Sequence, residues 1–280
     1  MAQKYEYITE LYRQTLVNIT STRKAWMNFL STASRQYSHP FEEQILIHAQ
    51  RLDTEMVLTL HEWNRKYGRW VNKNSTGIAV FDRKNTGRTA LKYYFDISDT
   101  HPSRFSHPVN IWRMEPDCEK DVIETLENIC GELSDKSDLA SAILSAARNA
   151  ADDHIIDYLP DLLEHRKNTP MEELDDLNVE VIYKRLVSNS MAYIIMQRCG
   201  INPHEYFSAE DFFDLYNFNT PDTVNALGTA ASDIAEMALR EISQTIRTVQ
   251  LEERGQNRTF ADPGQSRYDR SRKQPERSDD

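Results

Sequence analysis

The sequence is poor in the residues on which several common protein classes depend. Its 8 glycines are too few for a nucleotide-binding α/β enzyme built on several glycine-rich turns. The 3 cysteines, Cys118, Cys130 and Cys199, are odd in number and far apart, so we expect a reducing cytoplasm and no disulfide framework. No window approaches the about 18 apolar residues of a membrane span. The start MAQKYEYITELYRQ is too polar for a secretory signal.

Apolar residues are nevertheless frequent enough for a folded core. Hydrophobic residues make up 39% of the chain and include 13 Tyr, 10 Phe and 4 Trp, which excludes a wholly disordered protein. The net charge of −11 is unevenly divided, because residues 1–110 sum to +5, residues 111–250 to −16 and residues 251–280 to 0. A basic front joined to an acidic back indicates two parts with different partners.

Hydrophobic spacing predicts that the first 115 residues form an α+β unit. Apolar residues at helical spacing indicate a helix over residues 4–20, and Thr22 or Ser21 is a suitable cap for a second helix. Pro40 is expected at the first position of a third helix, followed by two glutamates in its first turn. A short strand is predicted at residues 55–60.

The next segment predicts a small antiparallel sheet. The segments Gly77–Phe81 and Ala90–Phe95 are each predicted to be a strand. A polar turn joins them, which indicates a hairpin. Val109–Met114 is interpreted as a third strand. From there residues 116–251 are expected to be all helical, with a last helix opening at Thr220-Pro221 and ending near Leu251. Residues 252–280 lose their apolar residues and are expected to be a disordered tail.

Basic and aromatic residues are interleaved between residues 63 and 95. Single-stranded DNA requires cations along the backbone and flat faces for the bases, so this region is the candidate nucleic-acid site. Strand alternation predicts Lys92, Tyr94 and Asp96 on the outer face, and Leu91, Tyr93 and Phe95 in the core. The alternative is a small sheet whose aromatics only pack and whose charges are only solvated. The candidate residues are Arg65, Lys66, Arg69, Trp70, Lys73, Arg83, Lys84, Arg88, Lys92 and Tyr94.

No complete catalytic or metal-binding pattern is apparent in the sequence. His154, Asp157, Asp161 and His165 share one helical arc, but their spacing spreads them along the helix axis, which favours a solvated face. His39, Glu43 and His48 are another candidate set for metal or acid–base chemistry, but His39 fits a loop or cap and Glu43 suits the N-terminus of the third helix. No phosphate-binding glycine loop is present. We therefore expect neither catalysis nor a metal or cofactor.

The stretch from Trp63 to Thr100 resembles the amino-terminal domain of ArdC-type antirestriction proteins. The resemblance implies an α+β domain that binds single-stranded DNA, found also at the front of large mobile-element proteins with helicase and methylase domains. The zinc peptidase motif of the family is absent, since His61-Glu62 lacks the second histidine. The matching positions are Gln44, Ile45, Leu46, Ile47, Trp63, Gly68, Arg69, Val71, Lys73, Gly77, Ile78, Phe95, Asp96, Ile97, Ser98 and Thr100.

The resemblance implies a non-enzymatic protein of a bacterial mobile genetic element. Its role would lie in antirestriction, counter-defence or the processing of DNA during conjugative transfer. The chain would be either a free-standing short relative or the front of a larger protein. The alternative, suggested by the acidic back, is a protein-binding inhibitor that mimics DNA or directly blocks a host defence nuclease or restriction enzyme.

Overall fold

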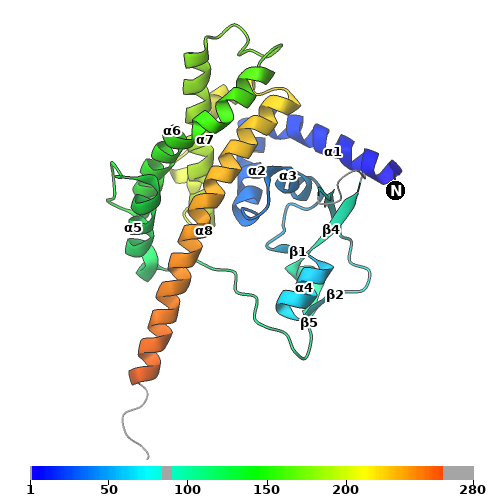
Figure 1. The fold of residues 1–280 in the computed structure, drawn as a ribbon, viewed down its shortest axis with the longest axis vertical. Helices are drawn as coiled ribbons and strands as arrows, with labels where there is room; N and C mark the ends of the chain where they lie inside the picture. Colours follow the sequence, from blue (N-terminus) through cyan, green and yellow to red (C-terminus); the bar gives the residue numbers. More distant parts are fainter. Residues whose placement is uncertain (1, 84–89, 261–280) are drawn as a thin grey trace, which may run out of the picture.

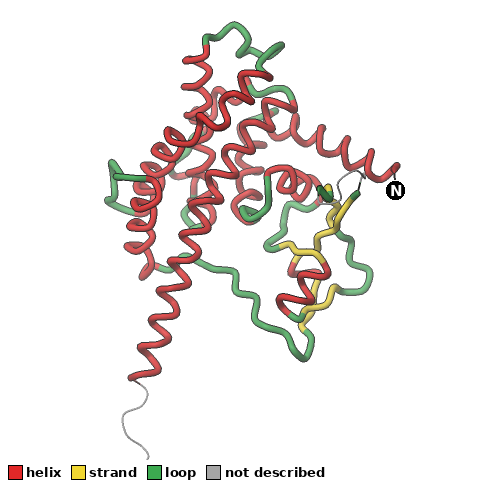
Figure 2. The backbone as a smooth tube through the Cα atoms, in the orientation of Figure 1, coloured by secondary structure: helices red, strands yellow, loops and turns green. Residues whose placement is uncertain are grey.

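The computed structural model describes residues 2–83 and 90–260. It confirms the predicted class: helices with small antiparallel sheets come first, and a helical unit follows (Figures 1 and 2). The predictions for Lys84, Arg88 and residues 261–280 lie outside the described residues. Within the described ranges, no helix is both long enough and apolar enough to cross a membrane.

The first three helices are α1 (Ala2–Thr20), α2 (Arg23–Arg35) and α3 (Phe41–Gln50). Thr22 caps α2, because its side chain accepts a hydrogen bond of 3.1 Å from the main-chain nitrogen of Ala25. Pro40 is the N-cap of α3 and not its first helical residue, which corrects the prediction. Its ψ of 155° is extended, while its carbonyl already accepts from the nitrogens of Glu43 and Gln44.

The predicted hairpin is present in a three-stranded antiparallel sheet. The sheet consists of β1 (Val57–Thr59), β4 (Leu91–Asp96) and β3 (Ile78–Phe81), in that order. In the hairpin, Ile78 lies opposite Tyr94 and Phe81 lies opposite Leu91. The sheet packs on α3 and α1 through a small apolar cluster that includes Val80 and Ile47.

A second, two-stranded ribbon was not predicted. It pairs β2 (Arg69–Val71) with β5 (Thr100–Pro102) in antiparallel fashion. The helix α4 (Leu60–Tyr67) precedes β2, and the short 3₁₀ helix η1 (Ile97–Asp99) precedes β5. Figure 1 shows α4, β2 and β5 together at the lower right, to one side of the long helices.

The predicted strand at Val109–Met114 is wrong, because this segment is irregular. Trp112 is buried and contacts Tyr37, in the turn after α2, and Arg198, at the end of α7, instead of a neighbouring strand. Its indole Nε1 donates to the Tyr37 hydroxyl at 3.0 Å, and its carbonyl accepts from Arg198 at 2.8 Å. The Arg198 guanidinium also lies 3.6 Å from the centre of a Trp112 ring. The segment is therefore a linker that is anchored on the helices.

The rest of the described chain is helical. The long helix α8 continues beyond the predicted end near Leu251 and projects past α5 (Figure 1). Aspartate caps begin two of the other long helices, since Asp138 and Asp175 each accept from a main-chain nitrogen three residues ahead. The elements are η2 (Pro116–Cys118), α5 (Glu119–Cys130), α6 (Leu139–His165), α7 (Asp176–Arg198), η3 (Pro203–Glu205), η4 (Ala209–Asn217) and α8 (Pro221–Phe260).

One apolar core joins the first three helices to the last four. The Trp26 indole donates to the Ser190 hydroxyl at 3.0 Å, which links α2 to α7. The Ser232 hydroxyl donates to the buried Gln44 side chain at 2.9 Å, which links α8 to α3. Among the described elements, α4 and the strands contribute no residue to this core, so they form a separate outer part.

Candidate nucleic-acid interface

The ribbon presents an aromatic pair to solvent. Trp70 on β2 lies directly opposite His101 on β5, so the two side chains share one face. Trp70 is 51% exposed, and His101 is also exposed. Nδ1 of His101 lies 2.7 Å from the Oδ1 of Asn72, which fixes the imidazole beside the indole when that nitrogen carries the proton. This face, which we call the platform, therefore presents two exposed aromatic rings to solvent.

The platform rests on an anchored helix. Thr59 and Glu62 form a capping box at the start of α4. The buried Trp63 donates from Nε1 to the carbonyl of Phe95 at 2.7 Å, which ties α4 to β4. Gly68 then ends the helix with φ at +60°, and the chain turns directly into β2.

A second exposed aromatic stands beside the ribbon. The main-chain nitrogens of Ser103 and His107 donate to the carbonyls of Gly68 and Tyr67, at 3.1 and 2.9 Å. These bonds hold the loop that carries Phe105, which is 79% exposed. The Arg104 guanidinium lies 6.0 Å from the Phe105 ring centre. The sequence predicted a proline-bounded loop at residues 101–108, but it did not assign His101 or Phe105 to the candidate site, because the three-residue strands β2 and β5 that place them carry no detectable alternation.

Positive charge around the platform is largely uncompensated. Arg65 and Lys73 are exposed, and no ion pair links either of them to another described residue. The Arg69 guanidinium donates to the hydroxyl and the carbonyl of Thr100, at 2.7 and 2.9 Å, and both acceptors are neutral. Lys66 differs, since it pairs with Glu62 at 3.3 Å. Arg69 lies on the opposite face of the ribbon from Trp70, because the two residues are neighbours in β2. We define the ribbon surface as Arg65, Trp70, Lys73, His101, Arg104 and Phe105.

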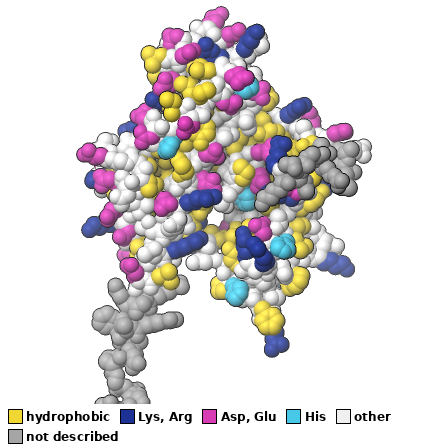
Figure 3. Space-filling model, in the orientation of Figure 1, with side chains coloured by type: hydrophobic (Ala, Val, Ile, Leu, Met, Phe, Trp, Pro, Cys, Tyr) yellow, Lys and Arg dark blue, Asp and Glu magenta, His cyan; other side chains and the backbone are white. Residues whose placement is uncertain are grey.

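The distribution of charge is visible on the molecular surface. In Figure 3 the part formed by α4, β2 and β5, at lower right, shows dark blue and cyan side chains with little magenta. Magenta carboxylates are spread over the helices of the larger part. On this face, the part formed by α4, β2 and β5 is therefore richer in basic than in acidic side chains.

Three other candidates that the structure describes, Arg83, Lys92 and Tyr94, lie elsewhere, against acidic side chains of α3. Arg83 pairs with Glu42, with its Nε 3.0 Å from Oε2. Lys92 pairs with Glu43 at 2.6 Å, and the Tyr94 hydroxyl donates to the same carboxylate at 2.7 Å. These residues surround the hairpin, whereas Arg65, Arg69, Trp70 and Lys73 belong to the ribbon region. The structure therefore divides the candidate set between two places.

The predicted faces of β4 are wrong for Tyr93, Tyr94 and Asp96, which corrects the assignment of Lys92, Tyr94 and Asp96 to the surface, whereas Leu91 packs against the small apolar cluster as predicted. Tyr94 is 5% exposed and Asp96 is 3% exposed, whereas Tyr93 is 37% exposed. The physical reason is that Glu43, from a different element, satisfies the polar ends of Lys92 and Tyr94. Their apolar parts can then pack inward. A buried Tyr94 offers no face to a nucleobase.

Glu43 is a buried carboxylate with three hydrogen-bonding partners. Besides Lys92 and Tyr94, Nδ1 of His39 lies 3.1 Å from its Oε2. Burial would raise the pKa of Glu43, but the hydrogen bonds from His39, Lys92 and Tyr94 outweigh it and lower the pKa from 4.5 to about 2. Because the carboxylate is fully occupied, we assign it the task of holding β4 against α3.

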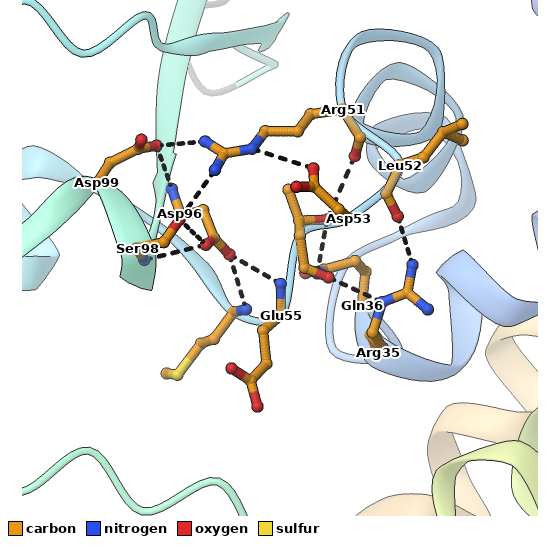
Figure 4. Close-up of polar contacts among 11 residues, drawn as sticks. Arg35, Gln36, Arg51, Leu52, Asp53, Glu55, Asp96, Ser98 and Asp99 are labelled. Atoms are coloured by element: carbon orange, nitrogen blue, oxygen red, sulfur yellow. Dashed lines mark hydrogen bonds and ion pairs between the residues drawn. The ribbon is translucent and has the colours of Figure 1, made fainter.

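The residues of the Phe-Asp-Ile-Ser-x-Thr segment have structural partners (Figure 4). Asp96 Oδ1 accepts from the nitrogens of Glu55 and Met56, at 2.8 and 3.1 Å. Its Oδ2 accepts from the hydroxyl and the nitrogen of Ser98, at 2.6 and 3.0 Å. Arg51 adds an ion pair of 2.7 Å to Asp99. This network fastens the loop between α3 and β1 to the end of β4.

The potential metal ligands and the cysteines of the described residues do not form a shared cluster. Within residues 2–83 and 90–260, no three His, Cys, Asp or Glu side chains converge as metal ligands would. On α6, Nδ1 of His165 lies 2.8 Å from the carbonyl of Asp161. Burial raises the pKa of Cys130 to about 11 and that of Cys199 to about 12, so both thiols are protonated at neutral pH.

Comparison with known proteins gives no match: no family model, no curated protein and no solved structure is similar to the chain. The resemblance to the ArdC-type domain therefore stays a prediction that rests on the residues quoted for it.

Proposed function

We propose that the protein binds single-stranded DNA through the ribbon surface. The observation that carries this proposal is the exposed pair of Trp70 and His101, set among cations without carboxylate partners. Stacking of a base on an exposed indole contributes about 1–3 kcal/mol, and each cation near a phosphate releases counterions. A flat aromatic face with flanking cations suits an unpaired strand, whose bases are free to stack.

The biological setting follows from the resemblance. We propose a non-enzymatic, cytoplasmic role in antirestriction or in the processing of single strands during transfer of a bacterial mobile element. The ribbon surface would bind the phosphates and the unpaired bases of such single strands.

The test is fluorescence anisotropy of a labelled oligothymidine with the full chain. The full chain is needed because α2 and α3 share a core with α7 and α8. We expect Trp70→Ala to weaken binding roughly 5- to 150-fold with little change in salt dependence. Lys73→Ala should instead flatten the log–log salt slope by about 0.7.

Two control variants outside the ribbon surface show whether any loss of binding is specific to that surface. Phe213 is 54% exposed on η4, and Arg148 is exposed on α6, so Phe213→Ala and Arg148→Ala remove an aromatic and a cation at a distance. Both should bind as the unmodified chain does. If the unmodified chain binds no single strand at about 50 mM salt, the proposal is wrong, and the acidic helices become the surface to test against protein partners.

A further inference from the structure

A cleft of about 660 Å³ opens between α1, α2 and α3, and none of its lining residues belongs to the ribbon surface. Its volume lies within the range of about 300–1,000 Å³ that is usual for small-molecule sites. Neutral polar side chains and apolar side chains line it together with Arg35 and His48, and none of its lining residues is a carboxylate. A second cleft, next to the start of α8, is different because Glu42, Asp222 and Asp233 line it.

Arg35 gives the α1–α2–α3 cleft a positive charge that no bonded anion cancels. Its guanidinium donates to the carbonyls of Ser31, Leu52 and Thr54, at 2.8, 2.6 and 2.8 Å (Figure 4 shows the last two). Asp53 and Asp96 act on it only through space. Three of the five guanidinium N–H groups are used, and the other two have no hydrogen-bond partner among the described residues.

Further polar groups line the same cleft. Asn18 on α1 and Asn28 on α2 are exposed, and neither amide has a hydrogen-bond partner among the described residues. His48 lies 2.8 Å from the Thr32 hydroxyl. Burial and Arg35 lower the pKa of His48 to about 4, so the imidazole is neutral at pH 7 and offers hydrogen bonding without charge. Leu11 and Ile19 provide an apolar wall.

We propose that this cleft binds a small phosphate ester. The phosphate would lie against the free N–H groups of Arg35 and the amides of Asn18 and Asn28, and the organic part would pack on Leu11 and Ile19. A phosphate monoester has three terminal oxygens, which suits a set of donors larger than a carboxylate needs. This site is separate from the ribbon surface and does not depend on the function proposed for it.

Isothermal titration calorimetry of the full chain with three probes tests the proposal. Deoxyadenosine monophosphate should bind at least about tenfold more tightly than either deoxyadenosine or inorganic phosphate. Only the monophosphate has both a phosphate for the polar groups of the cleft and an organic part for its apolar wall. Arg35 also holds the loop before β1, so the informative variants lie on the exposed rim. Asn28→Asp should weaken binding of the monophosphate roughly tenfold, and Asn28→Lys should strengthen it.

Two control variants complete the experiment. Asn110→Asp introduces the same charge at an exposed position outside the cleft and should leave the affinity unchanged. Trp70→Ala should also leave it unchanged, which keeps this test independent of DNA binding by the ribbon surface. The proposal is overturned if the monophosphate does not bind, if deoxyadenosine binds equally well, if Asn28→Asp behaves as Asn110→Asp does, or if Trp70→Ala abolishes binding.

Discussion

The side-chain amide of Gln50 pairs with both main-chain polar groups of Ala79. Its Nε2 donates to the Ala79 carbonyl at 2.8 Å, and its Oε1 accepts from the Ala79 nitrogen at 3.0 Å. Ala79 lies on β3, at the edge of the three-stranded sheet. The end of α3 therefore satisfies this edge in the way that another strand would, and so protects it from pairing with a second chain.

Gln50→Glu should destabilise the protein by about 1–3 kcal/mol at pH 7. The glutamate carboxylate has no N–H to donate to the Ala79 carbonyl, so a carboxylate oxygen and the carbonyl oxygen, both acceptors, would face each other. Urea denaturation followed by circular dichroism measures the loss. Gln244→Glu is the control, because Gln244 is exposed on α8 and makes the same charge change. Equal denaturation midpoints for the two variants would show that the edge needs no such partner.

Gly68→Ala should loosen the loop that carries Phe105. The residue has φ at +60°, and an added Cβ would lie 2.7 Å from the Phe105 carbonyl oxygen. Gly200→Ala is a close control, because φ is +80° there and nothing lies within 4 Å. Hydrogen exchange at the amides of Ser103 and His107 should accelerate in the first variant alone. Unchanged protection would mean that the loop tolerates the extra methyl group.

Glu43 should make the protein sensitive to acid. Its folded pKa of about 2 lies below the ordinary 4.5, so the stabilisation is complete above about pH 4.5 and is lost as the pH falls toward 2. Glu43→Gln should remove stability on the order of 2–3 kcal/mol at pH 7 and give a flatter pH profile below 4.5. Denaturant titrations from pH 3 to 7 provide the comparison. Parallel profiles for both proteins would contradict this assignment.

His48 should remain neutral well below the usual range of histidine. Its pKa is lowered to about 4, so unfolded chains bind more protons than folded ones between pH 6.5 and 4. Stability from this group is therefore complete above about pH 6.5 and falls as the pH drops through that window. A proton NMR titration should place His48 below His165, whose pKa is raised by its hydrogen bond to Asp161. The reverse order would refute the burial of His48.

The sequence predicted most of the helices and the hairpin, because caps, turns and hydrophobic spacing involve residues that are close together in the chain. Thr22 caps α2, and Gly68 ends α4, through contacts a few residues away. The ribbon was not predictable in this way, since β2 and β5 have three residues each and pair across about 30 positions of sequence. The face of Tyr94 was mispredicted for a similar reason, because the carboxylate that satisfies its hydroxyl comes from α3.

The candidate site was predicted in part. Arg65, Arg69, Trp70 and Lys73 lie together around the ribbon, as the clustering in sequence suggested. Arg83 and Lys92 belong to the same basic stretch of sequence. In the fold, however, they form ion pairs with Glu42 and Glu43 of α3. The sequence therefore predicted where along the chain the cations cluster. Which of them form ion pairs depends on the tertiary fold.

The hydrogen bond between Trp26 and Ser190 also bears on the timing of folding. The two residues are 164 positions apart. At a synthesis rate of about 5–20 residues per second, α2 leaves the ribosome roughly 10–30 seconds before its partner α7 is made. During that interval Trp26 and its apolar neighbours lack the surface that buries them. A nascent chain of this protein therefore needs shelter, from the ribosome or a chaperone, until its carboxyl-terminal helices emerge.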